Sequence, residues 1–321
     1  MSADTARNQD RNQHQDQGPA AASTAGGMSR RGWLGAAGGI AAAAVAIPAM
    51  EGAASAADDV DWKIKNGRIQ QSVCHWCFEP MPLEELARAA AAMGIKSIEI
   101  VGPETWPTLK KHGLICAMTP SHGFVRGLNN KKYHAECIEK LTAAIDATAA
   151  AGFPNVITFS GMREGLTDEE GIKNTIEALK QVLPLAEKKK VTLCLEPLNT
   201  RVDVEMKGHP GYQCDRVEWA AEVCEKIGSD RVKILFDIYH TQVMQGDVIV
   251  RLQKYKDLIG HYHTAGNPGR NDIGIDQEIN YPAIMRAIVA TGYKGFVGQE
   301  YIPSGEDKIA RLRHGVQLCD V

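Results

Sequence analysis

Acidic and imidazole side chains stand at the ends of four apolar, strand-like segments in the second half of the chain. The run VTLCLEP carries Glu196, and VKILFDIYH carries Asp237. LIGHYHTAG carries His261 and His263, and GFVGQEY carries Glu300. Carboxylate oxygens with a single imidazole suit Mn²⁺ or Mg²⁺, with Co²⁺ as a further candidate, better than they suit a structural zinc site. The residue types therefore predict a divalent metal site, provided that the fold brings these segments together.

Each of these residues alone has an ordinary explanation, as an acid at a loop or a histidine at the surface. Four such donors at consecutive strand ends are much harder to explain by coincidence. Side chains two positions apart on a strand point to the same side. Strand register alone therefore does not choose between His261 and His263 as the imidazole ligand.

The pair of glutamates indicates acid–base chemistry on a sugar-like substrate. Glu196 and Glu300 would stand on opposite sides of the substrate, and one of them would take a carbon-bound proton. A divalent ion would polarise the neighbouring carbonyl and stabilise an enediolate. Return of the proton to another carbon is isomerisation, and return to the opposite face of the same carbon is epimerisation. His240 and Arg270, in FDIYH and GNPGR, are candidate substrate-binding residues, with a helix-start histidine and a solvated loop arginine as the alternatives.

Short apolar runs alternate with amphipathic helical patterns from about residue 68 onward. This alternation predicts an α/β protein with a parallel sheet, and eight units in about 250 residues fit a single (β/α)8 TIM barrel. The strands are expected at 69–76, 96–102, 114–120, 155–161, 191–197, 232–240, 258–266 and 295–301. Helices are expected at about 82–93, 104–112, 132–151, 167–190, 214–228, 241–256 and 281–292, and after the last strand.

The barrel prediction matters because the carboxyl ends of its strands meet at one face, where TIM-barrel active sites lie. The four donors would converge there. An open doubly wound sheet is the alternative fold, but no G-x-G-x-x-G pattern follows the first strand.

The N-terminal segments are not expected to belong to the barrel, which is assigned to residues 58–321. Residues 1–27 are polar and lack an apolar period, which is typical of disorder. Residues 28–57 combine the pair Arg30 and Arg31, a weakly apolar Ala/Gly-rich stretch and a small-residue site ending at Ala56. This pattern predicts a twin-arginine signal, handled by the twin-arginine export machinery and cut after Ala56, and hence a periplasmic protein. An uncleaved membrane anchor is the alternative.

Composition and cysteine content set further bounds. The 321 residues are 44% hydrophobic and 23% charged, with a formal net charge of −3, so no electrostatic case exists for a nucleic-acid partner. Cys74 and Cys77 form a lone C-x-x-C for which a disulfide after export is a minor alternative. Other cysteines in apolar runs are expected in the core: Cys116, Cys137, Cys194 and Cys224.

The segments LEPLNTR, FDIYHTQVMQGD, IGHYHTAGNPGR and EINYPAIMRAIVATGYKGFVGQEY resemble the hydroxypyruvate isomerase family. That family belongs to the xylose-isomerase-like TIM barrels, which include the ketose 3-epimerases, and the close match covers about residues 190 to 305. The resemblance implies that Glu196 and Glu300 are the acid–base pair and that Asp237 is a metal ligand. Hydroxypyruvate isomerases carry glutamine where this chain has His263, whereas ketose epimerases carry a histidine ligand. The resemblance thus favours His263 as the ligand and leans toward the epimerases.

The resemblance leaves the substrate open between a sugar and a hydroxy-keto acid. Asn199, in the E-P-x-N-T-R motif, is a further candidate substrate-binding residue, and a homo-oligomer is implied by likeness alone. Three other functions compete: elimination from a 3-keto glycoside, phosphodiester cleavage on the same barrel, and a non-catalytic exported sugar-binding protein. His75, His122 and Arg126 lie in loops expected to shape substrate choice and receive no role.

Overall fold

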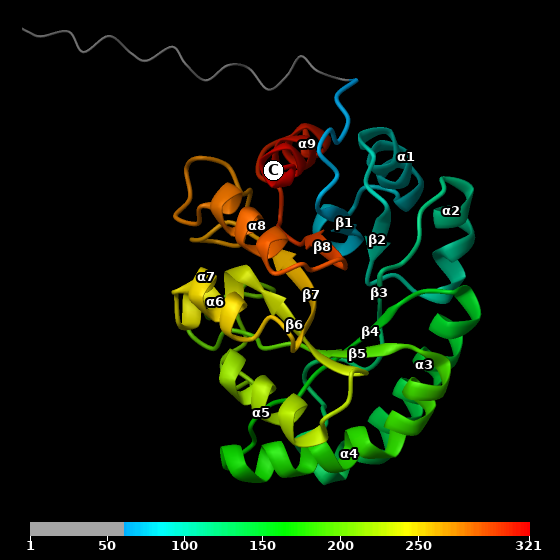
Figure 1. Cartoon of the computed structure of the whole chain (residues 1–321), viewed down its shortest axis with the longest axis vertical. Coiled ribbons are helices and arrows are strands. Elements are labelled where there is room, and N and C mark those ends of the chain that lie inside the picture. The colour runs from blue at the N-terminus through cyan, green and yellow to red at the C-terminus, as the bar shows by residue number, and fades with distance from the viewer. Residues whose placement is uncertain (1–60) are drawn as a thin grey trace, which may run out of the picture. The chain divides into compact units, whose positions relative to one another are not determined.

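Eight parallel strands form a barrel in the part of the chain that the computed structural model describes, residues 61–321 (Figure 1). The strands are β1 Gln70–Cys74, β2 Ser97–Glu99, β3 Met118–Thr119, β4 Asn155–Thr158, β5 Thr192–Leu195, β6 Val232–Asp237, β7 Ile259–Thr264 and β8 Phe296–Gln299. Their order around the barrel is β2-β1-β8-β7-β6-β5-β4-β3. The TIM-barrel prediction is confirmed.

The barrel closes between β2 and the segment that leads into β3. The N–H of Ile98 donates to the carbonyl of Ile115 at 3.1 Å, and the N–H of Ile100 donates to that of Met118 at 2.8 Å. Because β3 has only two residues, these bonds complete the ring without a full ladder.

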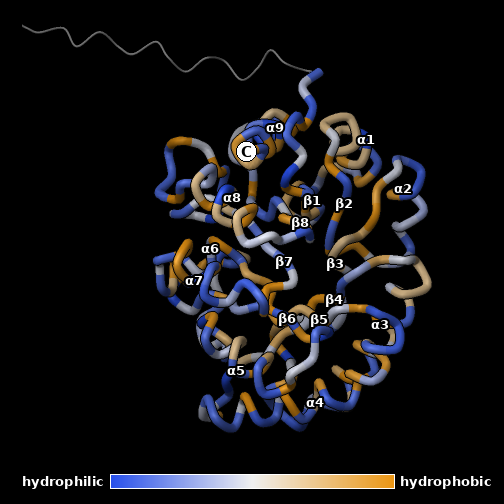
Figure 2. Tube along the Cα trace, in the orientation of Figure 1, coloured by the Kyte–Doolittle hydropathy of each residue, from blue (hydrophilic) through white to orange (hydrophobic). Residues whose placement is uncertain are grey.

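Helices follow the strands and surround the sheet (Figure 1). They are α1 Leu83–Met93, α2 Trp106–Lys111, α3 His134–Ala151, α4 Asp168–Lys189, α5 Val217–Ile227, α6 Ile238–Met244, α7 Val248–Lys254, α8 Tyr281–Ala290 and α9 Lys308–Cys319, with 3-10 turns η1 His75–Phe78, η2 Pro103–Thr105 and η3 Lys131–Tyr133. Hydrophobic and hydrophilic residues alternate along α4 and α5, as expected where one helix face packs on the sheet (Figure 2).

Several elements end differently from the sequence prediction. The strand expected over 232–240 stops at Asp237, because the Asp237 side chain accepts the N–H of His240 and caps α6. The helix expected over 241–256 divides into α6 and α7 at Gly246 and Asp247, which both have positive φ. The strand expected over 69–76 ends at residue 74, and a 3-10 turn carries the next four residues.

A capping box starts α4. The Thr167 hydroxyl accepts the N–H of Glu170 at 3.2 Å, and the Glu170 carboxylate accepts the N–H of Thr167 at 2.9 Å. Thr167→Ala is expected to lower the free energy of unfolding by about 1 kcal/mol, because it leaves an end N–H without a partner. Urea denaturation followed by circular dichroism measures this, with exposed Lys173→Ala on the same helix as a near-neutral control. Equal stabilities would contradict the prediction.

All eight cysteines lie within the described residues, and all are buried and unpaired. Cys74 and Cys77 therefore form no disulfide, and they occupy the end of β1 and the following turn. The proposed segments 1–27 and 28–57, the cut after Ala56 and the membrane-anchor alternative lie outside the described residues. Among the helices of residues 61–321, none is long and apolar enough to span a membrane.

Candidate metal and acid–base site

Four donor side chains meet at the carboxyl ends of β5, β6, β7 and β8, which are neighbours in the sheet. Ligand atoms of Glu196, Asp237, His263 and Glu300 all lie within 4.8 Å of one another, and all four residues are buried. The structure thus brings together the four residues that the sequence analysis selected.

Sheet register explains this convergence. Asp237 pairs with His263 across β6 and β7, and His263 pairs with Gly298 across β7 and β8. A Cβ atom on Gly298 would lie 2.8 Å from Cδ2 of His263 and 3.0 Å from Oε2 of Glu99. The glycine therefore leaves the space in which the imidazole is held.

Glu99 orients the histidines of β7, and the sequence analysis did not identify it. Its Oε2 lies 2.9 Å from Nε2 of His261 and 3.0 Å from Nε2 of His263, and its Oε1 accepts the hydroxyl of Ser72. Although burial opposes ionisation, the two histidines lower the pKa of Glu99 to about 2. The carboxylate thereby turns Nδ1 of His263 toward the other three donors, whereas His261 contacts Glu99 and is not one of the four.

Arg270 lies against two of the four donors. Its Nη2 donates to Oε2 of Glu300 at 2.6 Å and to Oδ2 of Asp237 at 3.3 Å, while its Nη1 donates to the carbonyl of Met206. The guanidinium carbon also lies 5.2 Å from the ring centre of Trp76. Arg270 is buried, so the alternative of a solvated loop arginine is wrong.

His240 presents one ring nitrogen to the site. Its Nδ1 accepts the backbone N–H of Asn199 at 3.0 Å and lies 2.7 Å from Asn199 Nδ2. Two donors on Nδ1 place the ring proton on Nε2, which has no hydrogen-bond partner within residues 61–321. Burial and the charge of Arg270 lower the pKa of His240 well below its usual value. His240 is therefore a neutral ring that can donate from Nε2.

Asn199 is fully buried, and its amide is used within the protein. Its Nδ2 also donates to the carbonyl of Lys207 at 2.8 Å, and its Oδ1 accepts the N–H of Val202 at 3.1 Å. Asn199 therefore positions His240. The predicted contact of Asn199 with substrate stays a prediction.

The two glutamates differ in their surroundings. Trp76 donates to Oε1 of Glu300 at 3.0 Å. Burial opposes ionisation of Glu300, but His263 and Arg270 hold the pKa of its carboxyl well below the usual range. Burial and the nearby charge of Glu300 raise the pKa of Glu196 to about 7. Neighbouring carboxylates with separated proton affinities are typical of acid–base pairs.

The donor set has the chemistry of a divalent cation site. Among the described residues, Oε1 of Glu196 and Nδ1 of His263 are buried without a hydrogen-bond partner, although Nδ1 lies 2.9 Å from Oε2 of Glu300. Burial disfavours the imidazolium, yet the charge of Glu300 raises the pKa of His263 well above its usual value. Unpartnered donor atoms in surroundings this negative fit a bound cation.

A pocket of about 340 Å³ opens onto this site. Glu196, Glu300 and Arg270 lie in its wall. Much of the remaining wall is aromatic or aliphatic: Trp76, Ile100, Phe124, Ile157, Phe159, Leu198 and Met206. Most of these residues come from the turn after β1 and the loops after β3, β4 and β5.

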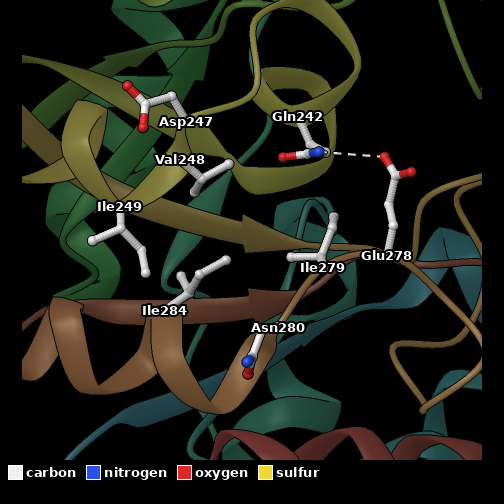
Figure 3. Close-up of a pocket in the computed structure, with 8 residues that line it drawn as sticks. All are labelled: Gln242, Asp247, Val248, Ile249, Glu278, Ile279, Asn280 and Ile284. Atoms are coloured by element: carbon white, nitrogen blue, oxygen red, sulfur yellow. Dashed lines mark hydrogen bonds between the residues drawn. The ribbon is translucent and has the colours of Figure 1, made fainter.

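A second hollow, of about 250 Å³, lies on the outside of the barrel between α6, α7 and the start of α8 (Figure 3). Val248, Ile249 and Ile284 line it, and Gln242 donates to Glu278 at 3.3 Å beside it. The four donors do not line this hollow, so the chemistry is assigned to the barrel mouth.

The known proteins to which this chain is similar include hydroxypyruvate isomerases. A human protein named putative hydroxypyruvate isomerase is 29% identical over 236 residues, which cover 72% of this chain and 78% of that protein. The hydroxypyruvate isomerase of Escherichia coli is 30% identical over 164 residues, 51% of this chain and 61% of that protein.

Solved structures share the fold. An AP endonuclease of family 2 from Brucella melitensis is 25% identical, covers 74% of this chain and 95% of its own, and has a TM-score of 0.67. A 3-keto-D-glucoside 4-epimerase from E. coli is 19% identical, covers 78% of this chain and 98% of its own, and has a TM-score of 0.66.

A family match extends over most of the barrel. Residues 87–319 match the family described as "Xylose isomerase-like TIM barrel". This range includes the strands that carry all four donors. The chain therefore belongs to the xylose isomerase-like TIM barrel family.

Proposed function

We propose that this isomerase-class enzyme is metal-dependent and moves a proton between carbons, or between faces of one carbon, of a sugar or keto acid. The observation that carries the proposal is the grouping of four buried donors within 4.8 Å at the barrel mouth. The named isomerase relatives support the same reaction class.

The ion would be held by Glu196, Asp237, His263 and Glu300. When bound, a divalent ion supplies Lewis acidity that favours charge on a substrate oxygen. Oxygen donors with one imidazole favour Mn²⁺ or Mg²⁺, with Co²⁺ as the next candidate.

The chain's own groups would move and hold the protons. Glu196 and Glu300 would exchange the carbon-bound proton, one removing it and the other returning it. His240 would donate from Nε2 to a substrate oxygen, because Asn199 occupies its Nδ1. Arg270, held between two carboxylates, would offer its remaining donors to the substrate. Both glutamates are buried, which would limit the access of water while the proton is transferred.

Metal analysis and isotope exchange test the proposal. The purified protein is expected to contain about one divalent ion per chain and to incorporate solvent deuterium into an α-hydroxy ketone. Chelation should abolish the exchange, and added Mn²⁺, Mg²⁺ or Co²⁺ should restore it. Exchange that persists in metal-free protein would refute the metal dependence.

Glu99 provides a separate test of how the site is held. Glu99→Gln is expected to weaken divalent-ion affinity by about 10- to 100-fold, because the amide cannot fix two imidazoles as the carboxylate does. Calorimetric titration of metal-free protein measures this. Glu104→Gln, an exposed acid five residues away, is the matched control. Unchanged affinity in the Glu99 variant would contradict the assigned role.

The pocket distinguishes this proposal from phosphodiester cleavage. A nucleic-acid backbone needs several exposed cations, whereas Arg270 is the one arginine or lysine among the described residues that line the pocket and is already paired with two carboxylates. An intact set of donors also favours catalysis over a purely sugar-binding role.

A further inference from the structure

The pocket at the barrel mouth is larger than a small keto acid needs. Its volume is about 340 Å³. At about 30 Å³ for each water, the pocket has the volume of about eleven waters, whereas a three-carbon hydroxy-keto acid has seven non-hydrogen atoms. Such an acid held against Glu196 and Glu300 would therefore leave a ring-sized part of the pocket unfilled.

The pocket wall offers little to a negatively charged substrate. Arg270 is held by Asp237 and Glu300. Burial and Arg270 lower the pKa of His209 to about 4, and burial also lowers that of His122, so both rings are neutral. Away from the four donors, a carboxylate would meet no positively charged side chain among the described residues of the wall, which favours an uncharged group in that part of the pocket.

The part of the pocket beyond the donors is mostly apolar, and two of its polar side chains already have partners. His122 lies 2.8 Å from the Thr158 hydroxyl and 3.1 Å from the Gly123 carbonyl, and Ser121 donates to the Ile157 carbonyl. Sugar hydroxyls placed here would lose water and gain few partners, at a cost in free energy. An aromatic or alkyl group would gain from burial.

Aromatic rings shape this far part of the pocket. Phe124 lies edge-on to Phe159 with ring centres 6.2 Å apart, and 4.4 Å from the ring of His209. Both phenylalanines are only half-buried, so part of each ring faces open space. Offset and edge-on contacts of this kind favour a planar ring as the occupant.

Several residues of the pocket wall have strained backbone conformations. Within residues 61–321, six non-glycine residues have positive φ, and three of them line the pocket. They are Ile100 at 56°, Met206 at 59° and Arg270 at 54°. A β-branched residue with positive φ costs about 1–3 kcal/mol and is retained where its side chain is needed. The strained backbone at Ile100 therefore supports a role for this wall in binding.

From these observations, we infer that the substrate is an uncharged keto-sugar glycoside with an apolar, aromatic aglycone. This inference rests on the proposed function: the sugar carries the α-hydroxy ketone and lies against Glu196 and Glu300. The aglycone lies against Phe124, Phe159 and Ile100. The class excludes free three-carbon acids as the preferred substrate.

A matched set of compounds tests the inference. Phenyl and methyl glycosides of one keto-sugar, a keto-disaccharide and hydroxypyruvate are incubated with metal-loaded protein in D₂O, and NMR measures isotope uptake. The phenyl glycoside is expected to have a kcat/KM about 10- to 100-fold above that of the methyl glycoside, from burial of the ring. Saturation-transfer NMR on metal-free and metal-loaded protein should show magnetisation passing from the protein to the phenyl protons.

Variants locate the aglycone contact. Phe124→Ala is expected to reduce the preference for the phenyl over the methyl glycoside about tenfold. Val125→Ala, at the adjacent residue that is 55% exposed and outside the pocket wall, should keep the wild-type preference. If Phe124→Ala fails to fold, the comparison of the phenyl and methyl glycosides with the wild-type protein still tests the inference.

The outcomes separate this inference from the proposed function. Isotope uptake into no compound would defeat the proposed function, while saturation transfer would still report whether the aromatic group binds. Uptake that is fastest with hydroxypyruvate, equal for the phenyl and methyl glycosides, or fastest with the disaccharide would overturn the aromatic aglycone. Absence of saturation transfer to the phenyl protons would overturn it as well.

Discussion

Glu196→Gln is expected to lower the rate of carbon–hydrogen exchange by about 10²- to 10⁴-fold, the usual contribution of a positioned base. The amide has nearly the shape of the carboxylate but cannot take the proton. Oε1 of Glu196 has no hydrogen-bond partner within the described residues, so the substitution breaks no hydrogen bond of that atom. Circular dichroism and the unfolding midpoint should match the wild type. NMR detection of solvent deuterium in the substrate gives the rate.

Glu300→Gln is expected to lower the rate to a similar extent but with an added cost in stability. Trp76 and Arg270 both donate to the Glu300 carboxylate. The amide would leave the buried guanidinium with Asp237 as its remaining negatively charged partner. Exposed Glu306→Gln, near Glu300 in sequence, is the control for both variants and should retain full activity. Near-normal exchange in either active-site variant would refute its role in proton transfer.

The four donors could be predicted from the sequence because two regular patterns fix them. Alternating strands and helices place all strand ends on one face of the barrel, and each donor closely follows or ends an apolar run. The family resemblance then chose His263 over His261. The structure brings the chosen histidine to the carboxylates and leaves the other one against Glu99.

Glu99 could not be assigned from the sequence for a physical reason. It lies in a strand of three residues within KSIEIVG, where the one visible signal was an acid inside an apolar run. A partner 162 positions away holds it, and no local pattern reports such a contact. The positioning role of Asn199 could not be assigned for the same reason, since its contact with His240 spans 41 positions of the sequence.

The residues that line the pocket could not be predicted from the sequence either. Trp76 was placed on an expected strand, but it belongs to a 3-10 turn that aims its indole at Glu300. Phe124 and His209 come from different loops. Loop residues have no periodicity that predicts which of them meet, so substrate choice depends on tertiary structure that the sequence pattern does not encode.

Asp237→Asn is expected to weaken divalent-ion affinity by at least about 10²-fold, more than the usual loss of an outer-shell partner. Isotope exchange should fall in parallel when little ion is present. Asparagine keeps the oxygen that caps α6, because Oδ1 of Asp237 accepts the N–H of His240 at 3.0 Å and asparagine caps as well as aspartate. The helix start and the His240 ring should therefore stay in place, and the change should act mainly through the lost charge.

Two measurements separate loss of the ion from loss of the fold. Calorimetric titration with Mn²⁺ gives the affinity, and thermal unfolding of metal-free protein reports the scaffold. Asp247→Asn, at the residue that precedes α7 and lies outside the site, is the matched control and should bind the ion as the wild type does. Exchange in Asp237→Asn should recover in part at high Mn²⁺ concentration, since three donors remain. Wild-type affinity in this variant would mean that the carboxylate between β6 and α6 serves only as a helix cap, and the metal centre would then have to be assigned to other donors.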